Sequence, residues 1–572
     1  MTSQYCQQIN EQLLALIRDN VDLSVALGMP DHLNRLDDPS LEAMLDQVQR
    51  ARALIETIDV SRGEDFYERL DLELTRLYLE QWVFFDTLEL NGQPLRQQKP
   101  QGVDGVSGGI FQLFVNDERE ASDRLADILS RLEAAPGYLA AELAVLNIPV
   151  RRWRDIEVEQ AAGLPELFET ILNWARENAF VRLDALEAAV AATNAALEHY
   201  AGTLADMPTT DAFSIGREQM EALLDVKRIG KTPEALRQMA ADYMSATREE
   251  LEALRDRLVA KYQLADDTDL AALHDFLNER YAVALTDGRL ASVLDHYNAE
   301  KEKITAWNKA RGLFPIPEDQ DMVIIQTPGF LEPVIPAGAM WPPLPLRDGT
   351  RKSMVHLTLK EDELAEHTHL GIPIMMVHEG IPGHHLQFAS ASLQPSLIRR
   401  LFSANEHAEG WTTMLEDYML DNGYVEDELI DEVRFITKRD ISRLVARVGI
   451  DLYFMSGDKR FLEVGLDLSF DSEDPFENAA LLLKTATGFT DGRVQAELNW
   501  YSTEHGYPLS YLTGNRLVWE LKNELAENNP KNLPSEDLDR EFHRIYLESG
   551  CMPVSALRSV FSHEGLLQKP DS

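Results

Sequence analysis

The sequence predicts a mainly α-helical protein with a small β section in its second half. Roughly the first 310 residues show apolar side chains at helical spacing, three and four residues apart. Between Phe314 and Pro345 proline is dense and short apolar runs appear, after which the helical spacing returns. A chain of 572 residues is long enough for several domains, or for one large enzyme with lobes around a cleft.

Several helical stripes predict the first lobe. The clearest advances by four, three, four, three and four residues, through Leu186, Val190, Thr193, Leu197, Tyr200 and Leu204. A second stripe contains Leu125, Ile128, Leu129 and Leu132. Another helix is expected to begin with Thr232 as N-cap and Pro233 in the first turn, followed on one face by Leu236, Met239 and Tyr243. We expect these stripes to face the core.

Two strands are predicted in the β section. Residues 323–325 form a short apolar run that is typical of a buried strand, and Val355, Leu357 and Leu359 alternate with polar residues as in a half-buried strand. The second strand is a candidate edge for pairing with an extended peptide. We place the boundary between a helical N-terminal lobe, 1–315, and a second lobe, 316–572, at the start of this section.

Charge and composition exclude several classes of partner. The chain has 54 Lys and Arg against 97 Asp and Glu, a formal net charge of −43, which repels nucleic-acid phosphates and anionic lipid. No uninterrupted apolar run reaches the ~18 residues of a membrane span. The N-terminus lacks a basic stretch followed by an apolar core, and two cysteines do not make a disulfide framework. We therefore expect a cytoplasmic protein.

The stretch MMVHEGIPGHHLQF carries the strongest chemical signal. A common zinc peptidase helix reads H-E-x-x-H, with two histidines one helical turn apart and a glutamate after the first. Here His378 and Glu379 occupy the first two positions, but Pro382 stands where the second histidine is expected. His384 and His385 follow shortly afterwards. The spacing therefore differs from the common motif by two or three residues.

A break in the helix would reconcile this spacing with a metal site. On an unbroken helix, the two later histidines would lie about 9 and 10.5 Å along the axis from His378. Pro382 disfavours helical backbone at the preceding residue, and Gly383 tolerates almost any conformation. We expect a local break that returns His384 or His385 to the side of His378.

The remaining requirements of zinc chemistry also have candidates. Hydrolytic zinc sites use imidazole and carboxylate ligands, leave a coordination position open for water and keep a base nearby. Glu379 directly follows His378, so on a helix its side chain points about 100° away from that ligand. Downstream, Glu409 stands beside Gly410, where the missing side chain allows another element to approach. On spacing alone Glu409 is no better than a solvated surface glutamate.

The run His378–Gln387 resembles the HExxPGHHxQ signature of the bacterial "domain of unknown function 885" family, which is assigned to zincin-like, gluzincin-type metallopeptidases. The run Glu409–Trp411 with Glu416 resembles the EGWxxxxE element of that family. Residues 508–514 and 542–557 resemble its later motifs, the former only loosely in spacing. The resemblance covers the C-terminal half well and the N-terminal helices loosely.

The resemblance implies a large helical zincin-like metallopeptidase with a deep cleft and a single zinc ion. It implies Glu379 as general base, and His378 and Glu409 as metal ligands. The third ligand would be one of the two later histidines. Short-motif relatives often place a glycine just before the second histidine ligand, which favours His384, and His385 remains the alternative.

The resemblance also leads to a candidate for stabilising the transition state. In zinc peptidases a tyrosine commonly donates a hydrogen bond to the developing oxyanion. Tyr511 matches the family motif best, ahead of Tyr501, Tyr507 and His505. A buried structural tyrosine is the competing interpretation of Tyr511.

One segment departs from the family pattern. After a run of arginines the family often reads D-T-G-L-H, whereas this chain has Asp451 in the place of the histidine. If that histidine contacts substrate in relatives, substrate choice or activity is expected to differ here. The preceding Arg439, Arg443 and Arg447 share one helical stripe, so Arg447 is a candidate for holding a substrate carboxylate, although pairing with neighbouring acids competes.

The sequence therefore predicts a zinc metallopeptidase that cleaves small peptides, with a water molecule as nucleophile and Glu379 as general base. Two alternatives stay open. The first is a zinc hydrolase of a non-peptide ester, lactone or amide, which the same ligands would serve. The second is a non-catalytic binding protein that retains the fold, which the departure at Asp451 makes worth testing.

Overall fold

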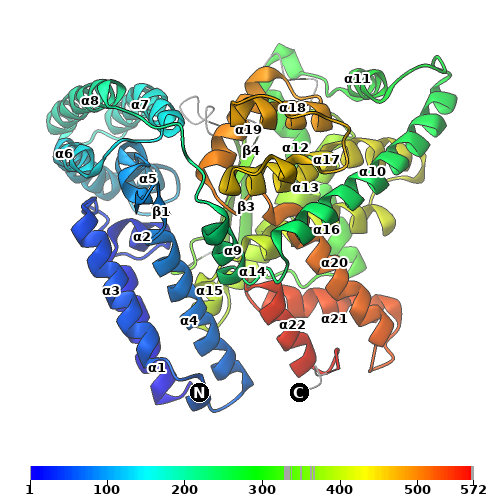
Figure 1. Ribbon diagram of the computed structural model, residues 1–572, viewed down its shortest axis with the longest axis horizontal. Coiled ribbons are helices and arrows are strands. Elements are labelled where there is room, and N and C mark those ends of the chain that lie inside the picture. The colour runs from blue at the N-terminus through cyan, green and yellow to red at the C-terminus, as the bar shows by residue number, and fades with distance from the viewer. Residues whose placement is uncertain are drawn as a thin grey trace. The chain divides into compact units, whose positions relative to one another are not determined.

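The computed structural model describes residues 2–327, 335, 338–347, 349, 351–360, 364 and 367–568. These residues are mainly helical with two small sheets, which confirms the predicted class (Figure 1). None of the described helices is long and apolar enough to cross a membrane. Two compact units are present: one contains the described residues of 1–215 and 344–348, and the other those of 216–328, 334–343 and 349–572.

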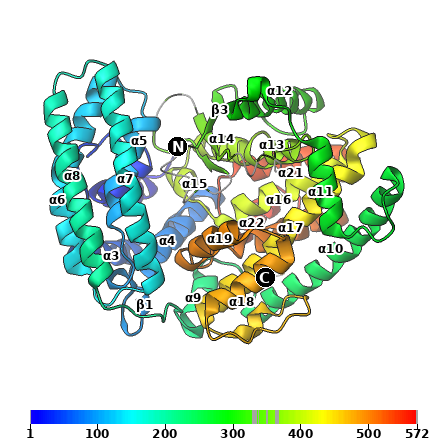
Figure 2. The same cartoon turned by 90° about the horizontal axis from the view of Figure 1, so that it is seen from above.

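The first unit consists of helices and one short hairpin. Its elements are α1 Gln4–Asp19, α2 Val21–Ala26, α3 Leu41–Thr57, α4 Phe66–Asp86, β1 Glu89–Leu90, β2 Gln93–Pro94, α5 Gly102–Val115, α6 Ala121–Val145, α7 Arg151–Glu177 and α8 Leu183–Asp206. Helices α6 and α7 pack against α8 (Figure 2). The stripes predicted within 125–132 and 186–204 are confirmed, since all of their side chains are buried.

The second unit contains the histidine-rich motif. Its elements are α9 Arg217–Val226, α10 Pro233–Tyr262, α11 Leu270–Tyr281, α12 Val293–Arg311, β3 Gln320–Gln326, β4 Gly338–Trp341, β5 Arg351–Leu357, α13 Gly371–Glu379, α14 His384–Ser392, α15 Leu397–Leu401, α16 Asn405–Asp421, α17 Ile430–Ser456, α18 Pro475–Thr487, α19 Asp491–Thr503, α20 Ser510–Asn528, α21 Ser535–Glu548 and α22 Val554–His563. The units divide at residue 215, ahead of the boundary predicted near 315, because α10 packs along α17 and α12 against α13.

Helix α10 begins as predicted. The Thr232 hydroxyl accepts a hydrogen bond from the backbone N–H of Ala235 at 3.2 Å, and Pro233 occupies the first turn. The buried stripe starts at Leu236 but continues through Ala240 and Met244, because the 3.6-residue period moves the core-facing stripe by one position. Tyr243 is therefore only half-buried.

The three-stranded sheet has the order β3-β5-β4, with β5 parallel to β3 and antiparallel to β4. The strands predicted around 323–325 and 355–357 are confirmed. His356 and Thr358 are buried as well as their apolar neighbours, so the prediction of a half-buried strand was wrong. Because β5 has a neighbour on each side, it cannot offer an edge to a peptide, which corrects a second expectation.

Helices α16 and α20 touch at a pair of glycines. A Cβ added to Gly410 would lie 2.4 Å from the carbonyl carbon of Gly514, and one added to Gly514 would lie 2.1 Å from the carbonyl oxygen of Glu406. The close approach expected at Gly410 is confirmed. The contact holds the first turns of α20 against α16, next to Glu409.

Substitution Gly514→Ala is expected to destabilise the protein by about 1–3 kcal/mol, since the new methyl group must displace the α16 backbone. The change should appear as a lower urea midpoint for the full chain. Gly492→Ala is the matched control, because its Cβ would meet nothing within 4 Å. An unchanged midpoint for Gly514→Ala would show that the helix contact is loose.

Candidate metal centre

The helix is interrupted between α13 and α14, as the Pro-Gly pair predicted. Helix α13 ends at Glu379 and α14 begins at His384. At Gly383 an added Cβ would lie 1.9 Å from the carbonyl oxygen of His378, so only glycine fits where the chain folds back onto the end of α13. The Trp411 indole donates a hydrogen bond to the carbonyl of Pro382 at 2.9 Å, which fixes the break against α16.

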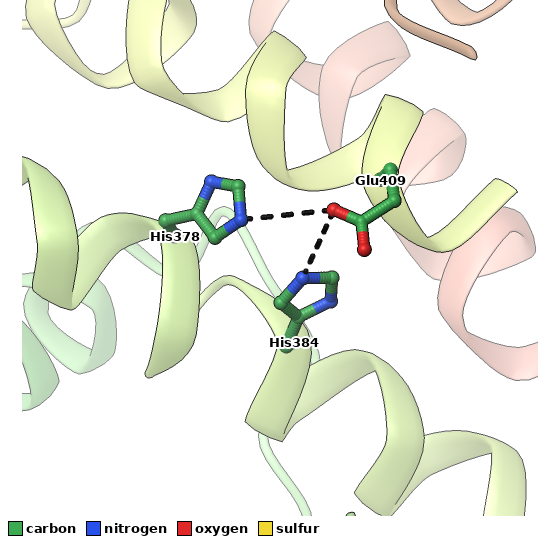
Figure 3. A group of neighbouring side chains, drawn as sticks. All are labelled: His378, His384 and Glu409. Atoms are coloured by element: carbon green, nitrogen blue, oxygen red, sulfur yellow. Dashed lines mark ion pairs between the residues drawn. The ribbon is translucent and has the colours of Figure 1, made fainter. Parts of the chain in front are cut away.

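The break brings three of the predicted ligands together (Figure 3). His378, His384 and Glu409 each offer a ligand atom, and these atoms all lie within 4.8 Å of one another. Glu409 Oε2 is 3.8 Å from His378 Nε2 and 3.4 Å from His384 Nε2. The three side chains come from three different helices, α13, α14 and α16.

The donor set fits a divalent metal such as zinc. Two imidazole nitrogens and one carboxylate oxygen are a common protein ligand set for catalytic zinc. Glu409 Oε2 is buried, and the described residues give it no hydrogen bond of acceptable geometry. A buried carboxylate oxygen without a partner is costly, and a cation held by these three side chains would remove that cost.

Glu416 orients His378. Its Oε1 lies 2.8 Å from His378 Nδ1. Because an ionised carboxylate only accepts hydrogen bonds, Nδ1 carries the proton and Nε2 presents its lone pair to the other ligands. Glu416 lies two helical turns beyond Glu409 on the same face of α16, so the two carboxylates reach the two ends of one histidine.

Tyr507 supports the carboxylate ligand. Its hydroxyl donates to Glu409 Oε1 at 2.8 Å, which leaves Oε2 directed at the histidines. The sequence ranked Tyr507 below Tyr511, and it assigned no role to Glu416. The i, i+7 spacing of Glu416 from Glu409 could have revealed the shared helix face, whereas no local signal marks Tyr507.

The pKa shifts show that the cluster favours positive charge. Burial acts to lower the pKa of His378, but the hydrogen bond that it donates to Glu416 and the charges of Glu379 and Glu409 outweigh burial, so the pKa is raised. Burial acts to raise the pKa of Glu409, but His384, His378 and Tyr507 together lower it to about 2. Glu409 therefore remains ionised beside the imidazoles.

The predicted base lies next to the ligands. Glu379 is the last residue of α13 and is half-buried. Its Oε2 is shielded from solvent and has no hydrogen-bond partner within the described part of the chain. A carboxylate that is not engaged elsewhere is free to accept a proton at this position.

His385 points away from the cluster. Its Nδ1 lies 2.7 Å from Ser353 Oγ, and its Nε2 lies 2.5 Å from Gln320 Oε1. Both ring nitrogens are therefore used against the sheet. Consecutive side chains on a helix diverge by about 100°, so only one of the adjacent histidines can join His378, and in the structure that one is His384.

Tyr511 and Arg447 lie together beside this cluster. The rings of Tyr511 and Tyr507 are 5.8 Å apart between centroids, and Arg447 Cζ lies 4.3 Å from the Tyr511 ring centre. The buried Arg447 guanidinium also donates to Glu497 at 3.0 Å and to Tyr501 at 2.9 Å. These contacts match the expected competition from neighbouring acids, and the role of Arg447 toward substrate stays a prediction.

Asp451, which stands where the family pattern often has a histidine, is buried beside the loop that carries Tyr507. It is 0% exposed, and its carboxylate accepts backbone hydrogen bonds from Gly506 and Leu509, each at 3.0 Å. These two residues bracket Tyr507. Asp451 therefore holds the loop that presents Tyr507 to Glu409.

This chain of contacts predicts a non-additive loss of zinc affinity. Asp451→Leu removes the acceptor of two buried N–H groups, and Tyr507→Phe removes the hydroxyl on Glu409, so each is expected to weaken zinc binding about tenfold. Competition with a chromogenic chelator would measure the dissociation constants. If Asp451 acts through Tyr507, the double variant binds about as well as either single variant. A hundredfold loss in the double variant would show independent effects.

Comparison with known proteins shows which family and which solved structures the whole chain resembles. The family described as "Bacterial protein of unknown function (DUF885)" matches residues 22–560. No curated protein matches. Two solved structures share the fold at 17% identity: a candidate lipoprotein of unknown function from Shewanella oneidensis, with a TM-score of 0.74 over 98% of this chain and 100% of that one, and a candidate lipoprotein from Colwellia psychrerythraea, with 0.77 over 98% and 99%. The chain thus belongs to the DUF885 family of bacterial proteins.

Proposed function

We propose that the protein is a zinc-dependent hydrolase of the zincin-like class, and most specifically a peptidase acting on small peptides. The convergence of His378, His384 and Glu409 carries this proposal. It brings together a zinc ligand set, in which Glu409 is ionised, and a half-buried glutamate at the end of the helix that carries the first ligand. Metal-assisted hydrolysis of an amide uses such a ligand set together with a nearby base.

The chemistry divides between the metal and the chain. Bound zinc would supply Lewis-acid polarisation of the substrate carbonyl and would lower the pKa of the attacking water. Glu379 accepts the proton of that water as the new carbon–oxygen bond forms. The same carboxyl group then delivers the proton to the leaving nitrogen as the carbon–nitrogen bond breaks.

Surrounding residues keep these groups in place. Glu416 fixes the tautomer and orientation of His378. Burial raises the pKa of Tyr511, so its hydroxyl remains protonated at neutral pH and is available to donate a hydrogen bond to the developing oxyanion. The ring contact with Tyr507 holds Tyr511 close to the ligand cluster.

The metal content of histidine variants tests the ligand assignment. The full chain is expected to bind about one zinc per molecule, and His384→Ala is expected to lose it because one of three protein ligands is gone. His385→Ala is the matched control, since this neighbour uses both ring nitrogens on Ser353 and Gln320. Elemental analysis after gel filtration measures the ratio. Zinc loss in His385→Ala with retention in His384→Ala would reverse the assignment.

Substitution Glu379→Gln tests the reaction. Removing a general base typically costs 10²–10⁴-fold in rate, so hydrolysis is expected to fall by about that factor while zinc is retained. A panel of short peptides, esters and lactones, assayed with zinc-loaded protein, would also separate a peptidase from an esterase. Glu302→Gln, at an exposed side chain of α12, serves as the control. Wild-type rates in Glu379→Gln would exclude the mechanism.

A further inference from the structure

A second recess lies in the same unit, between α10, α16, α17 and α20. Its volume is about 260 Å³, and its lining includes Tyr243, Asp417, Lys438, Asn515, Arg516 and Trp519. Two of its helices also carry the metal cluster and its neighbours. Asp417 directly follows Glu416, and Asn515 lies one helical turn beyond Tyr511.

The charges in this recess favour an anion. Lys438 Nζ pairs with Asp417 at 3.0 Å and with Glu250, which lies outside the lining, at 3.4 Å, and Arg434 pairs with Asp421 at 2.7 Å, which uses both lining carboxylates. Arg516 has no ion pair with any described residue, and its Cζ lies 5.9 Å from the centre of the Tyr243 ring, so its guanidinium is the lining charge that stays available to an anion. Although the whole chain has a net charge of −43, an arginine without a carboxylate partner in a recess attracts a carboxylate of a ligand.

The floor of the recess adds a second requirement. Asn515 lines it at 1% exposure, and neither its Nδ2 nor its Oδ1 has a hydrogen-bond partner within the described residues. A buried amide needs both an acceptor and a donor to satisfy it. A ligand that places a carboxylate next to an N–H group supplies both.

We propose that this recess binds the C-terminal residue of a peptide. The terminal carboxylate would lie against the Arg516 guanidinium and Asn515 Nδ2, while the last peptide N–H donates to Asn515 Oδ1. Tyr243 and Trp519 provide flat surfaces for the last side chain. The choice of a peptide as ligand rests on the proposed function, whereas the recess uses none of the metal-binding residues.

This assignment gives Arg516 the role that the sequence suggested for Arg447. Arg447 is already bound to Glu497 and Tyr501, whereas Arg516 has no ion pair within the described part of the chain. A site that requires a free carboxylate selects the ends of peptides over internal segments of a folded chain. The volume of about 260 Å³ accommodates one or two residues, below the usual range of drug-sized pockets.

Calorimetric titration of the full chain with N-acetyl-alanyl-alanine and with its C-terminal amide tests the proposal. Both peptides are titrated into Glu379→Gln protein, before and after metal removal, so that hydrolysis does not interfere. The free acid is expected to bind at least tenfold more tightly than the amide in both preparations. Arg516→Gln is expected to remove this preference, and so is Asn515→Asp, which keeps the shape but repels a carboxylate.

Arg460→Gln is the control, since this exposed arginine pairs only locally with Asp458. Equal affinity for acid and amide, or an undiminished preference in Arg516→Gln, would overturn the proposal. A preference that disappears on metal removal would also overturn it, because the carboxylate would then bind at the metal centre. A retained preference together with hydrolysis that ignores Glu379→Gln would count against the proposed function alone.

Discussion

The whole site depends on the tight return of the chain at Gly383. The carbonyl of His378 occupies the space that any side chain would need there, so the backbone can reverse and start a new helix with His384. The longer spacing of the motif is then no obstacle to bringing both imidazoles to one side. The hydrogen bond from Trp411 to Pro382 explains why a tryptophan stands two residues after Glu409: it ties the acidic helix to the break.

The second constraint is the glycine contact between α16 and α20. It places Tyr507 within reach of Glu409, while Asp451 holds the intervening loop from α17. The buried carboxylates of Glu409 and Asp451 each accept hydrogen bonds from a defined partner, as buried polar groups normally do. The result is that Glu409 presents one oxygen to a hydroxyl and the other to the histidines, a geometry that a freely rotating glutamate would not maintain.

The sequence predicted the helical class and the break because these depend on local spacing and on the special backbone properties of proline and glycine, whereas Glu409 entered the predicted ligand set only through the family resemblance. Residue spacing did not separate His384 from His385, and the resemblance only favoured His384, since their difference depends on where the sheet places Ser353 and Gln320. The roles of Tyr507 and Asp451 depend on packing between helices distant in sequence. The strand order was also out of reach, because alternation of residues does not say which strand is central.

The acidic net charge does not prevent binding of an anionic ligand, because repulsion by distant charges is screened while the contacts inside the recess are not. A charge of −43 repels a peptide carboxylate in solution, but salt screens exposed charges beyond about 8–10 Å. At contact, the Arg516 guanidinium and the Asn515 amide act with little solvent between them and the ligand, where each interaction is stronger than at the surface. The acidic surface then discourages anionic polymers such as nucleic acids, which cannot reach a recess of this size, while the recess itself still favours a single carboxylate. The recess therefore distinguishes a peptide carboxylate from an anionic polymer by size as much as by charge.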